Sequence, residues 1–162
     1  MSFIKAEIVF EGRLWNPNAA NQAAKRAIKL GLTGAAEFFK TEVALATPVG
    51  ADGNLSKAWS TEWDEQKQQA IVFNPMEYAL ATELGRKAAP VPIKPYARWF
   101  RRKLGLSEKA AIGAAIASSK KKAKEATPGQ FFTKKTFNSN LKKINDNFIQ
   151  PIGGKLIEEL SK

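Results

Sequence analysis

The chain has 162 residues, of which 44% are hydrophobic, and this length and composition suit one globular domain with its own core. It contains no cysteine and no histidine. The missing cysteine excludes disulfides, thiolate metal sites and a cysteine nucleophile. The missing histidine removes the commonest general base and transition-metal ligand. An enzyme would have to work with Asp, Glu, Lys, Ser or Tyr alone, or with a hard cation such as Mg²⁺. We therefore expect a protein that is not an enzyme and that has no cofactor.

The net charge of +11 is unevenly distributed along the chain. Residues 86–162 carry 18 Lys and Arg against 5 Asp and Glu, whereas residues 61–85 carry 1 against 5. The basic half is predicted to face nucleic acid, an acidic protein surface or water. The first residues lack the apolar core of a signal peptide, and no run of 18 apolar residues follows. We therefore expect a soluble product of the cytoplasm that does not enter a membrane.

The first elements predicted are a strand and a long helix. Apolar and polar residues alternate from Ile4 to Phe10, which is typical of a strand with one apolar face. Asn18 can cap a helix that we expect from about Ala19 to about Ala46. Its apolar stripe comprises Ile28, Leu32, Ala35, Phe39, Val43 and Ala46. Gly31 and Gly34 within it indicate either a kink or the close approach of a neighbour.

A β-hairpin is predicted next. Residues 55–63 alternate in polarity, the polar residues 64–68 follow, and the apolar run Gln69–Phe73 then forms the second strand. The N-terminal strand can add to this hairpin, and the long helix can cover the sheet. The fold class expected is therefore α+β, with a small antiparallel sheet packed against a long helix.

Helices separated by glycine and proline are predicted for the rest of the chain. One runs from Met76 to Leu84 and stops at Gly85. Prolines 90, 92 and 95 form a rigid connector into a basic helix that ends at Gly105, and Ser107 caps an alanine-rich helix to about Lys124. A last helix is capped by Thr133 and interrupted by Pro151 and Gly153-Gly154. We expect a single domain over residues 1–162, with residues 106–130 as a mobile basic helical insertion.

Few residues are arranged for chemistry. The sequence holds no glycine-rich phosphate loop, no nucleophile elbow and no pair of catalytic carboxylates. Glu62, Asp64 and Glu65 are close enough in sequence to recruit a cation, but their spacing matches no known ligand loop. We therefore predict no metal site there.

Two groups of basic residues are candidates for contacts with DNA or an acidic partner. They are Arg98, Arg101, Arg102 and Lys103 in the first group, and Lys120, Lys121, Lys122 and Lys124 in the second. The simpler interpretation of the lysines is a solvated helix end. Tyr96 and Trp99 lie beside the first group. We expect these aromatic side chains to pack in the core and not to stack on nucleic-acid bases.

Glu83 is exceptional because it lies in a mostly apolar segment between Leu80 and Leu84. A partly buried carboxylate needs a hydrogen-bonded or charged partner. We expect a structural pair with Arg86 or Arg98, or else a pair between subunits.

Three short elements and their order resemble a known family. The first comprises Pro48, Val49, Asp52, Gly53 and Leu55, and the second Tyr78, Ala79, Glu83 and Gly85. The third is the connector of Pro92 and Pro95 into a helix with Trp99, followed later by Phe131-Phe132. Together they resemble the neck, head–tail joining and tail-completion proteins of tailed bacteriophages. The first element differs from the family pattern by one extra residue, no Thr before the Gly, and Ala58 where Ser is usual.

The resemblance implies a structural virion protein that forms a ring at the head–tail junction, as a neck or tail-completion component. Its implied partners are copies of itself, the head-closure or connector and tail proteins, and non-specifically the packaged DNA. Candidate subunit contacts or structural residues are Tyr78, Glu83, Gly85, Arg86, Pro92 and Pro95. The alternative is a basic nucleic-acid-binding module, although no recognised binding motif is present.

Overall fold

The structure is a computed structural model that describes residues 4–5, 17–50 and 52–160. Its contacts divide the chain into two compact units. Unit 1 comprises Met1–Leu45, Trp59–Asn74 and Lys134–Lys162, and unit 2 comprises Ala46–Ala58 and Pro75–Thr133. Each unit draws on separated parts of the sequence. The predicted mixture of a small antiparallel sheet, a long helix and C-terminal helices is confirmed.

Unit 1 contains an antiparallel sheet with the strand order β1-β3-β2. The hairpin of β2 (Ser60–Asp64) and β3 (Gln69–Phe73) pairs Glu62 with Ile71. The edge strand β1 (Ile4–Lys5) pairs Ile4 with Val72, so the N-terminal strand adds to the hairpin as expected. The remainder of that predicted strand, up to Phe10, falls outside the described residues.

The long helix α1 (Pro17–Ala46) is the main element of unit 1 and confirms the predicted helix. It begins two residues before the expected start, so Asn18 lies inside the helix and is not its cap. Proline suits this first position because its missing N–H has no intrahelical partner there. Leu32, Ala35, Phe39 and Val43 of the predicted stripe are buried, whereas Ala46 at its end is exposed.

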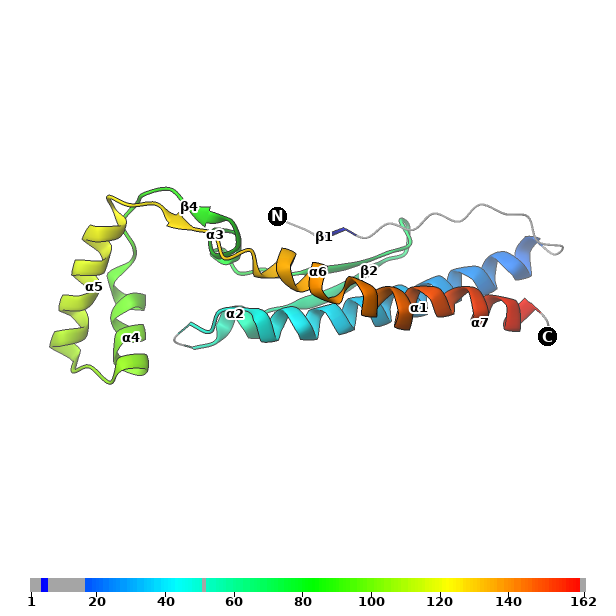
Figure 1. The fold of residues 1–162 in the computed structure, drawn as a ribbon, viewed down its shortest axis with the longest axis horizontal. Helices are drawn as coiled ribbons and strands as arrows, with labels where there is room; N and C mark the ends of the chain where they lie inside the picture. Colours follow the sequence, from blue (N-terminus) through cyan, green and yellow to red (C-terminus); the bar gives the residue numbers. More distant parts are fainter. Residues whose placement is uncertain (1–3, 6–16, 51, 161–162) are drawn as a thin grey trace. The chain divides into compact units, whose positions relative to one another are not determined.

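The C-terminal helices of unit 1 lie beside α1 (Figure 1). They are α6 (Phe132–Ile144), the π-helix η1 (Asn145–Ile149) and α7 (Gln150–Leu160). The predicted interruption at Pro151 and Gly153-Gly154 is wrong, because α7 continues through these residues. The wider π turn directly before Pro151 offers a reason, since a proline ring clashes with a carbonyl of the preceding α-helical turn.

Close approach, and not a kink, explains the two glycines of α1. A Cβ at Gly31 would collide with the side chain of Ile152, and one at Gly34 would lie 3.0 Å from the ring of Phe148. Phe38 contacts the same ring at a centroid distance of 5.5 Å. Phe39 meets Phe137 edge-to-face at 5.7 Å. Ile152 and Phe148 of the C-terminal helices therefore fill the space that the two glycines leave on α1.

Unit 2 begins with a loop and the short helix α2 (Asn54–Lys57). We predicted a strand from Leu55, and this part of the prediction is wrong. Gly53 adopts a left-handed conformation with φ 64°, and the Ser56 hydroxyl donates to the Gly53 carbonyl at 2.9 Å. These local interactions favour a helical turn over an extended strand. Strand β2 therefore starts only at Ser60.

Two short strands pair two distant segments of the chain in unit 2. Helix α3 (Ala79–Leu84) stops at Gly85 as predicted, and β4 (Gly85–Arg86) pairs with β5 (Thr127–Pro128). Gly85 has φ 84°, and a Cβ there would lie 2.5 Å from the Gly129 nitrogen. A Cβ at Gly129 would lie equally close to the Glu83 carbonyl oxygen. The two chain segments can touch only because both residues are glycine.

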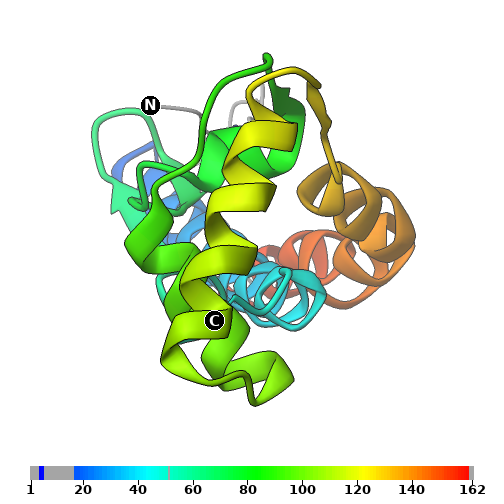
Figure 2. The same ribbon diagram turned by 90° about the vertical axis from the view of Figure 1, so that its left-hand side faces the viewer.

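The helices α4 (Ile93–Leu104) and α5 (Glu108–Lys122) pack side by side as a hairpin (Figure 2). Ala97, Ala111 and Ala115 form its buried core, and Tyr96 and Phe100 pack against them. Trp99, which we expected in the core, is half-buried, and Leu104 at the end of α4 is 58% exposed. Helix α5 lies within the predicted insertion at 106–130, and it shares its buried core with α4. The predicted cap is present, since Ser107 Oγ accepts from the Ala110 N–H at 3.4 Å.

Candidate functional site

The candidate site is a groove on the α4–α5 hairpin of unit 2. Pro92 precedes α4 and Pro95 lies in its first turn, as the sequence predicted, so the connector fixes where the helix begins. The groove has a volume of about 850 Å³. Its lining includes the basic side chains of Lys94, Arg98, Arg101 and Arg102 and the apolar side chains of Ile93, Ala97, Leu106 and Ile112. It therefore offers both cations and apolar area to a ligand.

Two acidic side chains lie at this surface, because Glu108 lines the groove and Asp52 pairs with two of its arginines. Arg98 Nη1 is 3.5 Å from one carboxylate oxygen of Asp52, and Arg102 pairs with the other oxygen. The two arginines are four residues apart, so they project from the same face of α4. Both remain more than half exposed. The pairs contribute little stability in such exposed positions, but they show that this surface accepts a carboxylate.

The other predicted basic contacts differ from one another in their surroundings. Lys103, Lys120 and Lys124 are exposed, and Lys121 is 4.0 Å from Glu125, which lies in the turn after α5. Lys122 is half-buried, its ammonium donates to the Thr127 hydroxyl at 3.3 Å, and its carbonyl accepts from the Ala89 N–H. The lysine run is therefore not one uniform surface, because Lys122 binds both β5 and the connector that precedes α4.

Glu83 has a structural interaction that differs from the predicted pair with Arg86 or Arg98. Its carboxylate accepts a hydrogen bond from the backbone N–H of Thr133 at 3.0 Å. Thr133 is the second residue of α6, where N–H groups lack intrahelical acceptors and the helix dipole favours a negative charge. Arg98 instead pairs with Asp52, and the Arg86 guanidinium donates to the Ala89 carbonyl at 2.7 Å. Glu83, and not Thr133, therefore caps this helix.

The remaining predicted residues surround this cap. Tyr78 precedes α3 and is 45% exposed, and Gly85 and Arg86 form β4. The segment after β5 is bound to α3 by the Gln130 N–H, which donates to the Thr82 carbonyl, and the Phe131 N–H, which donates to the Glu83 carbonyl. Glu83 thus contacts the same segment through its main chain and its side chain.

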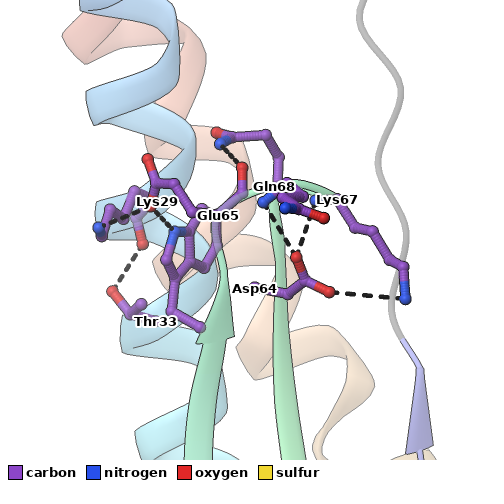
Figure 3. Close-up of polar contacts among 8 residues, drawn as sticks. Lys29, Thr33, Asp64, Glu65, Lys67 and Gln68 are labelled. Carbon is purple, nitrogen blue, oxygen red and sulfur yellow. Dashed lines mark hydrogen bonds and ion pairs between the residues drawn. The ribbon is translucent and has the colours of Figure 1, made fainter.

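Asp64 and Glu65 of the hairpin in unit 1 bind polar groups of the same unit (Figure 3). Asp64 accepts from the backbone N–H groups of Gln66 and Lys67 at 3.0 and 2.9 Å. Its hydrogen bond from Lys67 is the main reason that the pKa of Asp64 is lowered. Glu65 pairs with Lys29 at 2.9 Å and accepts from the indole of Trp63, and these two contacts lower the pKa of Glu65. In the described ranges, no group of three or more potential ligands could hold a metal ion.

Three important residues were missed in the sequence. The sequence predicts Asp52 only as part of a loop motif, and it gives Gly129 no role. Ser119 accepts from the Val91 N–H at 3.1 Å and donates to the Val91 carbonyl at 2.9 Å, which fixes the proline connector on α5. Ala111, Ala115 and Ser119 recur at steps of four, and this spacing is the signal that places Ser119 on the buried face of α5.

No match was found among known protein families, curated proteins or solved structures. Within the described ranges, every helix is too short or too polar to span a lipid bilayer.

Proposed function

We propose that this protein is a structural component of a tailed-phage particle that forms a ring at the head–tail junction, as a neck or tail-completion protein. It would act by binding and not by catalysis. Its partners would be copies of itself, the head connector and the tail, with non-specific contacts to packaged DNA.

One observation carries the proposal: the residues of two motifs that resemble the phage family have structural roles in unit 2. Tyr78, Glu83 and Gly85 belong to one such motif, and Pro92 and Pro95 to another. Glu83 caps α6, Gly85 permits the contact with Gly129, and the prolines lead into α4. These residues build a scaffold that presents the exposed basic groove, which suits a protein whose task is to bind neighbouring subunits.

Deletion of the gene from its phage genome tests the proposal. We expect filled heads and separate tails that do not join, and restoration of complete particles when the gene is supplied from a plasmid. Electron microscopy of the lysate counts the complete particles, the separate heads and the separate tails. Complete, infectious particles without the gene would overturn the proposal.

The exposed arginines of α4 also favour a second candidate, a nucleic-acid-binding module. Titration of mixed-sequence duplex DNA against salt separates the two, because each phosphate contact adds a salt-dependent term. Tight binding at physiological salt with a steep salt dependence would favour the module, whereas binding only at low salt is expected of a structural protein with a basic surface.

A further inference from the structure

We propose that the groove between α4 and α5 binds the surface around α3 of a second copy of this chain. The inference rests on the proposed ring and names the two surfaces that would form its interface. Both surfaces belong to unit 2.

The groove has features of a protein-binding site. Ile93 and Ile112 line it and are each 42% exposed, which is apolar area that a phosphate backbone would leave unused. Lys94, Arg101 and one carboxylate, Glu108, line it too, and neither of the two cations has an ion-pair partner among the described residues. The neighbouring Arg98 and Arg102 already hold the carboxylate of Asp52. The groove therefore suits a segment that carries carboxylates and apolar side chains together.

The surface around α3 has this complementary character. Tyr78, Leu80 and Leu84 are 45–57% exposed, which is unusual for three large apolar side chains within seven residues. Glu77 next to them is exposed. Of the carboxylates in residues 61–85, Glu77 and Glu83 are the two that lie in unit 2, and Glu77 is the exposed one beside the apolar side chains. Glu83 is not needed for the contact, because it caps α6.

The two surfaces consist of different residues, so the contact between copies would be head-to-tail. Such an interface leaves one free groove and one free α3 surface on each pair, and further copies can therefore add. The row of copies closes into a ring when the rotation angle between neighbouring copies is a whole-number fraction of a full turn. This is the type of interface that a ring requires.

Charge reversal on the full-length protein tests the contact. Arg101→Glu changes the groove and Glu77→Arg changes the α3 surface, and both residues are exposed. Lys142→Glu, at an exposed position of α6 outside both surfaces, is the matched control. Sedimentation velocity over a range of concentrations, at low and high salt, measures association, and circular dichroism checks that each variant is folded.

We expect the wild type to associate, with weaker association at high salt. Each of the two reversals should weaken association by at least about tenfold, and the control should leave it unchanged. An equimolar mixture of Arg101→Glu and Glu77→Arg should restore association to within about threefold of the wild type, because opposite charges again face each other.

Three results would overturn the inference: a wild type that stays monomeric at all concentrations, equal effects of Lys142→Glu and Arg101→Glu, or a mixture without rescue. The proposed function is tested separately by the gene deletion. If Arg101→Glu supports normal particle assembly while the deletion does not, the groove contact is excluded and the proposed function stands.

Discussion

The two units are stabilised in different ways. Unit 1 is held by large side chains, since Phe38 and Phe39 of α1 pack on Phe148 and Phe137. In unit 2 the α4–α5 hairpin has a core of alanines, and other segments are held by direct main-chain contacts such as that of Gly85 with Gly129. The aromatic packing of unit 1 should therefore be sensitive to the loss of side-chain volume, and the Gly85–Gly129 contact of unit 2 to the addition of a single methyl group.

The largest effect is expected in unit 1 from Phe39→Ala. Phe39 is 4% exposed, so its truncation leaves a cavity, and we expect the free energy of unfolding to fall by about 3–5 kcal/mol. Hydrogen exchange measures this in each unit separately. The control is Leu45→Ala, at a position that is 79% exposed, which should change stability by less than about 0.5 kcal/mol. Unchanged exchange in α1 of Phe39→Ala would remove this residue from the core.

In unit 2, Gly85→Ala should have the next largest effect. Its φ of 84° with ψ −179° belongs to a region that only glycine populates readily, and the added Cβ would meet Gly129. We expect a loss of about 2–3 kcal/mol. Gly113→Ala is the matched control, because it lies in α5 with open space around it and should stabilise by about 0.5–1 kcal/mol. Equal effects of the two substitutions would contradict the close approach of β4 and Gly129.

A smaller effect is expected from the cap of α6. Glu83→Ala removes the acceptor of the Thr133 N–H and should cost about 1–2 kcal/mol. Glu83→Gln keeps an acceptor oxygen but loses the charge at the helix N-terminus, so about half of this loss is expected. Exchange of the Thr133 amide reports the bond directly. The cap would be refuted if this amide were as protected in Glu83→Ala as in the wild type.

The smallest effect concerns acid stability of the hairpin in unit 1. The pKa of Glu65 is lowered by Lys29 and Trp63 in the folded state, so its contribution is present above the ordinary carboxyl pKa. That contribution is lost as the pH falls through the lowered value. Between about pH 4.5 and pH 2, the wild type should therefore lose slightly more stability than Glu65→Gln. Identical slopes in acid denaturation would exclude the Glu65 contacts.

Sequence periodicity predicted unit 1 better than unit 2. The stripe of α1 and the strand Gln69–Phe73 are local patterns, and both elements were predicted close to their observed ends. The continuation of α7 through Pro151 was missed because a π turn depends on packing that periodicity does not show.

Contacts between distant residues were the main source of error in unit 2. Glu83 and Thr133 are 50 residues apart, and Asp52 and Arg98 are 46 apart. No local pattern pairs such residues, so the sequence indicated that Glu83 needed a partner without showing which one. The basic residues of α4 were identified from composition, but the groove required the packing of α4 on α5.

The most direct test of the proposed function is an electron cryomicroscopy reconstruction of the head–tail junction in particles that carry a tagged copy of this chain. We expect a closed ring of identical copies at the junction, with the α4–α5 groove of each copy against the α3 surface of its neighbour. Purified, infectious particles that lack the tagged chain at the junction would contradict the proposed function.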